Sequence, residues 1–165
     1  MLFKQTRIGR NGVPFLIYKI KTIPTGASTP NAWGQFLRNS KLDEIPQLYN
    51  ILKGEMTLVG PRPDVPGYAD QLKGDDRIVL TLKPGITGLA SLKYRNEEQL
   101  LAQQPNPKQY NDEVIWPDKV RINKWYAAHR TLAMDFLILW YTFVPMPFDV
   151  DQYIRNNAEG IHYKK

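Results

Sequence analysis

The chain opens with two short strand-like apolar runs. These runs, residues 3–8 and 15–20, flank an Asn11-Gly12 pair. An Asn-Gly pair readily adopts the positive φ angles of a tight turn, and between two such runs it is a strong hairpin signal. The pattern therefore predicts an antiparallel hairpin near the N-terminus, followed by a loop over residues 22–31.

Between residues 33 and 53 the apolar positions recur at the spacing of one helix face. They lie three and four residues apart in two groups, Trp33, Phe36 and Leu37, and then Ile45, Leu48, Tyr49 and Leu52. This spacing predicts helix, and Gly54 suits the position just after a helix end.

The start of the second helical group has two interpretations. Ser40 followed three residues later by Asp43 matches a capping box, and a helix that begins there holds Pro46 in its interior, which predicts a kink. If Asp43 itself caps the helix, Pro46 falls within the first turn. Both interpretations place Asp43 and Glu44 at or near a helix N-terminus.

The middle of the chain is predicted to hold short elements separated by turns. Pro and Gly residues are spread along it, and these residues favour turns between elements. We expect a strand at the sequence TLVG, just before Pro61-Arg62-Pro63, and then a short helix over residues 68–73. A shaped loop or bulge is expected over 82–92. A helix over 97–104 and a Pro-rich connector over 104–110 follow.

The last predicted element is one long helix. Pro117-Asp118 suits its first turn, the helix runs to about Phe143, and Pro145 and Pro147 close it. Its second half is nearly all apolar and includes Trp140 and Tyr141. Such a segment is typical of a membrane interface, and a buried core helix explains the pattern equally well.

These elements together predict an α+β fold. The alternating βαβ pattern of a doubly wound sheet is missing. A chain of 165 residues, 42% hydrophobic and 23% charged, is long enough for one core. We expect a compact single domain over residues 1–165, with several helices around a small antiparallel hairpin and a long C-terminal amphipathic helix at the membrane interface.

Charge and composition narrow the partners and the chemistry. Lys and Arg outnumber Asp and Glu by 22 to 16, a net charge of +6, which favours phosphates, nucleotides or an acidic membrane surface. Cys is absent, and His129 and His162 lack metal-ligand spacing, so thiol catalysis and Cys or His metal centres are excluded. With no nucleic-acid-binding signature, we expect no nucleic acid partner. No signal peptide or 18-residue apolar run is present.

The densest cluster of chemically active residues surrounds Asp43 and Glu44. Arg38 and Lys41 lie close to them in sequence. A carboxylate can hold Mg²⁺ against a phosphate, and a neighbouring ionised carboxylate can attack phosphorus to form an acyl phosphate. The pair therefore suits phosphoryl chemistry, although acidic residues are common in the first turn of any helix.

A second cluster is Pro61-Arg62-Pro63. Flanking prolines fix the backbone and aim one guanidinium, which suits bidentate phosphate binding, although a surface turn has the same sequence. The loop KPGITG offers backbone donors near Lys83, but it lacks the residue order of a P-loop.

Three segments in this order resemble the bacterial sugar transferases, the monotopic phosphoglycosyl transferases. They read FKQTRIGRNGVPFLIYKIKT, FLRNSKLDEIPQLYNILKGEMTLVGPRP and LKPGITGLASLKYRN. The resemblance covers residues 3–143 and leaves 144–165 as a C-terminal extension. The block LDEIPQLYNILKGEMTLVGPRP is long and specific.

The resemblance implies an enzyme that transfers a sugar 1-phosphate in two steps. The donor is a nucleotide diphosphate sugar, usually a UDP-sugar, and the acceptor is polyprenol (undecaprenyl) phosphate. By the same resemblance Asp43 is the nucleophile that releases UMP, and Glu44 helps to hold the Mg²⁺ cofactor. Arg62 and Arg38 are implied to bind the nucleotide sugar and its phosphates, with Lys19, Arg95 and Arg7 in looser substrate-binding roles.

The resemblance also implies a location at the cytoplasmic face of the bacterial inner membrane, in polysaccharide or glycoconjugate synthesis. Family members begin with a re-entrant membrane helix, and this sequence begins at Met1-Leu2-Phe3, where that helix is expected to end. We therefore expect a truncated form, a gene fragment or a naturally anchorless form, which is peripheral or monotopic at the membrane, or soluble if truncated. An inert nucleotide-sugar-binding module is the alternative. Tyr94 stands where many relatives have Gly, and Asn123 where many have Asp.

Overall fold

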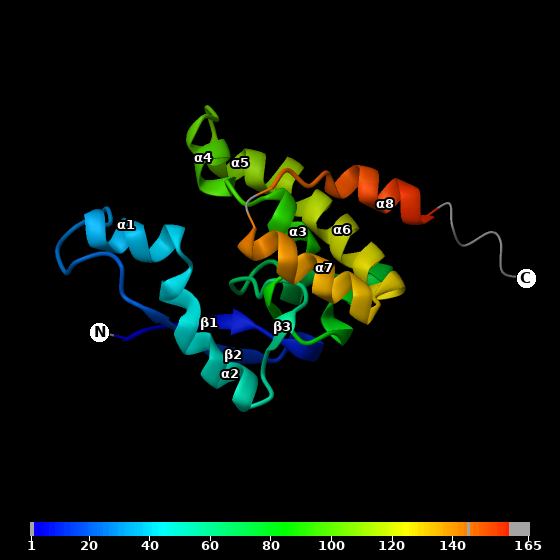
Figure 1. Cartoon of the computed structure of the whole chain (residues 1–165), viewed down its shortest axis with the longest axis horizontal. Helices are drawn as coiled ribbons and strands as arrows, with labels where there is room; N and C mark the ends of the chain where they lie inside the picture. Colours follow the sequence, from blue (N-terminus) through cyan, green and yellow to red (C-terminus); the bar gives the residue numbers. More distant parts are fainter. Residues whose placement is uncertain (1, 145, 159–165) are drawn as a thin grey trace, which may run out of the picture.

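The N-terminal segment forms the expected hairpin. In the computed structural model, which describes residues 2–144 and 146–158, strands β1 (Leu2–Ile8) and β2 (Pro14–Ile20) pair antiparallel, as Figure 1 shows. In the turn, η1 (Arg10–Gly12), Asn11 has a φ of 59° and Gly12 a φ of 79°. Asn and Gly tolerate this left-handed region best, so the Asn-Gly prediction is confirmed.

The helix expected over residues 33–53 is divided in the structure. Its parts are α1 (Ala32–Asn39), the 3-10 helix η2 (Leu42–Gln47) and α2 (Leu48–Leu52). Asn31 caps α1 by accepting a hydrogen bond from the Gly34 amide at 2.8 Å. Gly54, at a φ of 75°, follows α2 as expected.

Both capping interpretations of this segment are wrong. Ser40 ends α1, and its hydroxyl donates to the Phe36 carbonyl at 2.7 Å. Lys41 precedes η2 in the left-handed conformation, with a φ of 59°, and no side chain caps η2. The reversal at Lys41 therefore starts the new element, and Asp43 and Glu44 still lie in its first turn.

A second, parallel sheet joins β3 (Thr57–Val59) to β4 (Gly85–Thr87). The sequence TLVG forms the expected strand, whereas the loop expected over residues 82–92 is wrong, because it contains β4 and α3 (Leu89–Lys93). A Cβ on Gly85 would lie 2.2 Å from the Gly60 amide nitrogen. The glycines here serve close backbone packing rather than a loop conformation.

Short helical elements connect the two sheets to the C-terminal half. The helices expected over 68–73 and 97–104 are present in shortened form, and part of the Pro-rich connector is helical. These elements are η3 (Ala69–Gln71), η4 (Gly74–Thr81), α4 (Glu97–Ala102), α5 (Pro107–Tyr110) and η5 (Asn111–Ile115).

The single long helix expected after Pro117 is wrong, because the structure has α6 (Trp116–His129) and α7 (Leu132–Phe143). The chain is extended at Arg130 and Thr131, and the Thr131 hydroxyl accepts from the Met134 amide at 3.1 Å as the cap of α7. Asp135 accepts hydrogen bonds from Tyr126 at 2.5 Å and from Arg130, which fixes the corner between the helices. The end of α7 at Phe143 agrees with the sequence; Pro145 and His162 lie outside the described residues.

A further helix, α8 (Val150–Ala158), follows α7 and packs into the main core. That core is formed by α3, α6, α7 and α8 (Figure 1). Its most buried members are Leu89, Ile122, Tyr126, Ile138 and Val150. A second cluster joins the hairpin residue Ile8 to η3, η4 and α6. The described part of the C-terminal extension therefore belongs to the folded core.

Replacing Ile154 by Ala is expected to destabilise the protein, because this α8 side chain is buried among the residues of the main core. Such truncations cost about 2–5 kcal/mol, through lost burial and the cavity left behind. Thermal unfolding should show a lower Tm for Ile154→Ala, while Arg155→Ala, on the exposed side of α8, should unfold like the parent. Equal Tm values for both variants would contradict the packing of α8 on the core.

The buried-core interpretation of the apolar segment is confirmed for one side of α7, and the membrane-interface interpretation stays a prediction. One side of α7 is buried through Met134 and Ile138. The other side exposes an apolar stripe of Leu132, Phe136, Trp140 and Phe143, each more than 60% exposed. Along the described residues no helix combines the length and the apolarity needed to cross a membrane. α7 is thus apolar on both sides, and the stripe has no protein partner in the described chain.

Candidate active site

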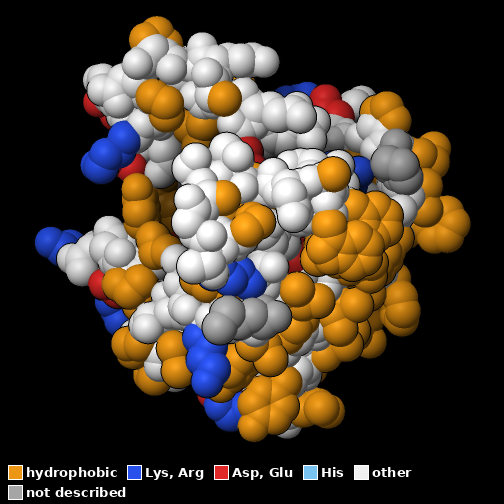
Figure 2. Space-filling model, turned by 90° about the vertical axis from the view of Figure 1, so that its left-hand side faces the viewer, with side chains coloured by type: hydrophobic (Ala, Val, Ile, Leu, Met, Phe, Trp, Pro, Cys, Tyr) orange, Lys and Arg blue, Asp and Glu red, His pale blue; other side chains and the backbone are white. Residues whose placement is uncertain are grey.

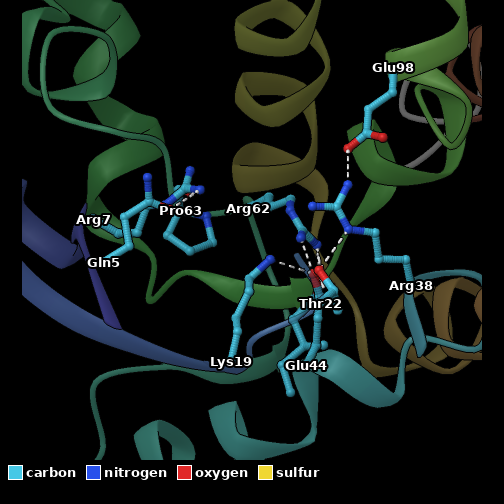
Figure 3. Close-up of polar contacts among 10 residues, drawn as sticks. Gln5, Arg7, Lys19, Thr22, Arg38, Glu44, Arg62, Pro63 and Glu98 are labelled. Atoms are coloured by element: carbon cyan, nitrogen blue, oxygen red, sulfur yellow. Dashed lines mark hydrogen bonds and ion pairs between the residues drawn. The ribbon is translucent and has the colours of Figure 1, made fainter. Parts of the chain in front are cut away.

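The Glu44 carboxylate lies where three segments of the chain meet (Figure 3). Lys19 of β2 donates to Glu44 Oε1 at 2.9 Å, and the Arg62 guanidinium, from the segment after β3, donates to both carboxylate oxygens. The Glu44 side chain is 7% exposed. Burial raises the pKa of Glu44, but the charges and hydrogen bonds of Arg62 and Lys19 outweigh it and lower the pKa to about 2. Glu44 is therefore ionised at physiological pH.

The Pro-Arg-Pro segment is anchored to both sheets. The Gly60 amide donates to Thr87 of β4 and the Gly85 amide donates to Pro61, each at 2.9 Å. From β1, Arg7 donates to the Pro63 carbonyl at 3.2 Å. Arg62 also donates to the Ile86 carbonyl at 3.1 Å, yet its side chain remains 42% exposed. Arg62 is therefore held against Glu44 and still presents part of its guanidinium to solvent.

Arg38 extends the positive surface from the side of α1. Its Nε donates to the Thr22 hydroxyl at 2.9 Å, and its guanidinium lies 3.7 Å from a carboxylate oxygen of Glu98 in α4. Glu98 is 88% exposed, so this ion pair is weak and open to solvent. Figure 3 shows Arg38 beside Glu44 and Arg62, which places a third cation at the site.

Two other basic residues expected at the site have different partners. Arg95 donates to the Tyr141 carbonyl in the last turn of α7, where helix carbonyls attract cationic side chains. Arg7 bonds Gln5 and Pro63 rather than Glu44. The structure thus brings together Lys19, Glu44, Arg62 and Arg38, and it gives Arg95 a helix-capping contact.

Asp43 has a different environment from its neighbour Glu44. It is buried, with 8% of its surface exposed, and no described residue donates a hydrogen bond to its side chain. Burial and the adjacent Glu44 charge raise its pKa, while Lys19, Lys41 and Arg38 act to lower it. Among the described residues, the Asp43 carboxylate therefore has no hydrogen-bonding partner, in contrast to the Glu44 carboxylate.

The residues at this site fit a magnesium ion shared with a substrate. Mg²⁺ usually takes one or two protein carboxylates and completes its shell with water and phosphate oxygens. Asp43 and Glu44 provide two adjacent carboxylates, and the described residues contain no cluster of three or more His, Cys, Asp or Glu that would hold a metal alone. A Mg²⁺ ion at this pair would need water or phosphate oxygens to complete its shell.

Two residues of this region carry no signal in the sequence analysis. Thr22 orients Arg38, and Asp64 directly follows the Pro-Arg-Pro segment. Burial raises the pKa of Asp64 to about 6, against the opposing charges of Lys119 and Arg7. In the sequence, Asp64 is distinguished only by its position next to the Pro-Arg-Pro segment. Its raised pKa could not be predicted, because the burial of a carboxylate depends on tertiary packing.

Replacing Asp64 by Asn is expected to stabilise the protein at neutral pH. The carboxyl titrates at about 6 in the folded state and near its ordinary 3.8 when unfolded, so the folded state binds more protons between these values. The free energy of unfolding therefore falls as pH rises through this window, by at most about 3 kcal/mol for a shift of this size. Asn has no charge to bury and avoids the loss.

Urea unfolding at about pH 4 and about pH 7.5 checks this expectation. Asp64→Asn should match the parent at the lower pH and exceed it at the higher. Asp75→Asn, at an exposed carboxylate of η4, provides the control. Parent-like stability of Asp64→Asn at the higher pH would contradict the burial of an unfavourable charge.

Comparison with known proteins gives a consistent result. The family model described as bacterial sugar transferase matches residues 1–148. The uncharacterized sugar transferase EpsL of Bacillus subtilis is 32% identical over 152 residues, which cover 86% of this chain and 67% of the relative. The undecaprenyl-phosphate galactose phosphotransferase of Salmonella typhimurium is 31% identical over 168 residues, covering 86% of this chain and 32% of the relative.

A third relative is the UDP-glucose:undecaprenyl-phosphate glucose-1-phosphate transferase of Caulobacter vibrioides. It is 36% identical over 107 residues, covering 56% of this chain and 40% of the relative. The chain thus spans two thirds of EpsL and well under half of the two transferases whose names state their substrates.

Proposed function

Because this chain belongs to the bacterial sugar transferase family, we propose that it transfers a sugar 1-phosphate from a UDP-sugar to undecaprenyl phosphate. The observation that carries the proposal is the buried Asp43-Glu44 pair. The Asp43 carboxylate accepts no hydrogen bond from a described residue, and the Glu44 carboxylate is bound by Lys19 and Arg62. The name of the Caulobacter vibrioides relative states such a transfer for that protein, and the name of the Salmonella typhimurium relative states an undecaprenyl-phosphate galactose phosphotransferase.

In the first step an oxygen of Asp43 attacks the β-phosphorus of the UDP-sugar. A bond forms between this oxygen and phosphorus, and the bond from phosphorus to the oxygen bridging the two phosphates breaks. UMP leaves with that electron pair, and Asp43 carries the sugar phosphate as an acyl phosphate.

The cations around the pair have two roles in this step. Arg62 and Arg38 would bind the diphosphate oxygens, and they stabilise the charge that develops as UMP leaves. Lys19 holds Glu44 in place. Glu44 would help to hold Mg²⁺, which when bound neutralises phosphate charge and orients the diphosphate.

In the second step a phosphate oxygen of undecaprenyl phosphate attacks the phosphorus on Asp43. The new bond joins the lipid phosphate to the sugar phosphate, and the bond to the Asp43 oxygen breaks. The carboxylate is regenerated, and the product is a lipid-linked diphosphate sugar. Because the acceptor resides in the membrane, the site works at the membrane surface, which we propose is the cytoplasmic face of the bacterial inner membrane.

The exposed apolar side chains support this placement. The space-filling view in Figure 2 shows hydrophobic side chains gathered along one side and the lower end of the molecule. Besides the α7 stripe, apolar side chains of η2 and α2 are exposed, including Ile45, Leu48 and Leu52. Leu52 is 85% exposed. Asp43 lies on the same short helix as Ile45, so membrane contact brings the nucleophile close to lipid.

Replacing Phe136 and Trp140 together by Ser is expected to weaken membrane binding. Each side chain buries apolar surface worth about 1.5–3 kcal/mol when fully transferred, so partial insertion predicts a loss of at least about tenfold in partition coefficient. Co-sedimentation with vesicles that contain anionic lipid measures it. Val114→Ser, at an exposed apolar residue of η5, should bind like the parent. Equal partitioning of all three proteins would contradict a role of α7 at the membrane.

The proposed activity is tested by measuring UMP release from a panel of UDP-sugars, with Mg²⁺ and undecaprenyl phosphate in detergent. Release together with formation of lipid-linked diphosphate sugar establishes the reaction and identifies the sugar. The alternative, an inert nucleotide-sugar-binding module, gives binding of a UDP-sugar without UMP.

A further inference from the structure

Asn50 lies on α2, the helix that directly follows η2, and has no exposed surface. Its Nδ2 donates to the Leu16 carbonyl of β2 at 2.7 Å and to a Glu55 carboxylate oxygen at 2.8 Å. Its main-chain carbonyl accepts from the amides of Glu55 and Met56 at 3.0 and 3.2 Å. Asn50 therefore joins three segments, namely β2, α2 and the turn that leads to β3.

The same three segments carry the ionic contacts of the site. Lys19 follows Leu16 by three residues on β2, Glu44 lies on η2, which runs directly into α2, and Arg62 follows β3. A hydrogen-bonded group of two cations and one carboxylate forms only when the segments are correctly placed. We propose that Asn50 is a positioning residue, which fixes β2, η2–α2 and β3 relative to one another and so aligns Lys19, Glu44 and Arg62 with Asp43.

The chemistry of the side chain supports this role over simple packing. β2 pairs with β1 alone in its sheet, so its outer edge presents main-chain groups that need other partners, and Asn50 satisfies the Leu16 carbonyl. The Asn50 Oδ1 is buried without a hydrogen-bond partner among the described residues. A leucine of similar size would avoid this unfavourable burial and make neither hydrogen bond. The amide of Asn50 thus holds the three segments together through its hydrogen bonds, although its own Oδ1 is buried without a partner among the described residues.

Asn50→Leu is the first test, and it rests on the proposed transferase activity. A displacement of about 1 Å at a reacting group lowers rates by about 10²-fold, so kcat for UMP release should fall about 10- to 100-fold, with a smaller change in KM. Ile154→Ala, which is destabilised through the packing of α8 on the main core, is the matched control and should keep kcat below its Tm. If kcat of Asn50→Leu falls no further than that of Ile154→Ala, a positioning role is overturned.

Asn50→Asp is a second variant, which keeps the shape of the side chain and replaces the donating NH2 group by an accepting oxygen. Its carboxylate faces two acceptors, the Leu16 carbonyl and Glu55, so kcat should fall as in Asn50→Leu. Adding Glu55→Gln places an amide donor opposite the introduced carboxylate. The oxygen of that new amide still accepts from Lys53, which Glu55 contacts at 2.6 Å in the parent. The kcat of the double variant should be at least about threefold higher than the kcat of Asn50→Asp, because one of the two hydrogen bonds is restored. No recovery would contradict the assignment of the Asn50–Glu55 bond to site alignment.

A stability measurement separates failure of this inference from failure of the proposed function. Asn50 hydrogen-bonds Leu16 and Glu55 rather than Lys19, so effects of independent changes at Asn50 and Lys19 should add. A positioning role requires that Asn50→Leu already weakens the Lys19–Glu44 contact. The urea midpoint of Asn50→Leu with Lys19→Met should therefore fall by less than the sum of the single shifts. Additive shifts overturn the inference even if the protein releases no UMP.

Discussion

Asp43→Asn is expected to abolish turnover while leaving the fold intact. An amide does not replace the carboxylate as a nucleophile, and loss of a nucleophile lowers kcat by at least about 10⁴-fold in comparable enzymes. The Asp43 side chain accepts no hydrogen bond from a described residue, so the substitution breaks no described contact. Burial and the Glu44 charge raise the pKa of Asp43, which means that its ionised form is disfavoured in the folded state. The variant, with a neutral amide at this position, should therefore unfold at the same temperature as the parent or at a higher one.

Intact-mass spectrometry without the lipid acceptor provides the most direct measurement. The parent should gain the mass of one sugar phosphate when UDP-sugar and Mg²⁺ are added, and Asp43→Asn should gain none. Asp75→Asn, at an exposed carboxylate outside the site, should behave as the parent does. An adduct on Asp43→Asn, or UMP release at the parent's rate, would exclude Asp43 as the attacking group and leave the transfer to another nucleophile.

The raised pKa of Asp43 combined with higher stability of Asp43→Asn would indicate a trade of stability for reactivity. A carboxylate held without hydrogen bonds is less solvated and more reactive than one at the surface. Glu44 has the opposite arrangement, because its two cations keep it ionised down to a pH of about 2. Two adjacent carboxylates therefore have pKa values shifted in opposite directions by their surroundings, which suits the separate roles that we propose for them.

The local elements of this fold could be predicted where a short sequence determines the backbone. Asn11-Gly12 determines the hairpin turn, because few other residue pairs accept two positive φ angles in succession. The break between α6 and α7 also has a local signal in the cap at Thr131, but the apolar residues on both sides of it continue the helical pattern and hide it. The β3–β4 sheet depends on Gly60 and Gly85 meeting across 25 residues of sequence, which no local pattern reveals.

The candidate site shows the same division. Asp43, Glu44 and Arg62 lie in one continuous motif, so their chemistry could be predicted together. Lys19 reaches Glu44 only because β2 packs along η2. Arg95 has the residue type of a phosphate ligand, and in the structure its guanidinium donates to the Tyr141 carbonyl at the end of α7, a contact that the sequence does not reveal. Asn50 carries no charge, and its importance follows only from its burial and its three hydrogen-bonded segments.

Glu44→Gln is expected to have the second-largest effect, and to affect both activity and stability. The variant leaves Lys19 and Arg62 without their shared carboxylate and removes a proposed Mg²⁺ ligand, so kcat/KM should fall about 10²- to 10³-fold. Stability should fall by about 1–3 kcal/mol, less than for a fully buried pair, because Arg62 is 42% exposed.

The pH dependence distinguishes a lost ion pair from a general packing defect. The pKa of Glu44 is lowered to about 2 from its ordinary value of 4.5, so its stabilising contribution is present above pH 4.5 and is lost as pH falls toward 2. Urea midpoints of the parent and Glu44→Gln should therefore differ most near neutral pH and converge in acid. A packing defect would keep the same gap at every pH. A constant gap would mean that the two cations around Glu44 contribute nothing to stability, and the electrostatic account of the site would then be wrong.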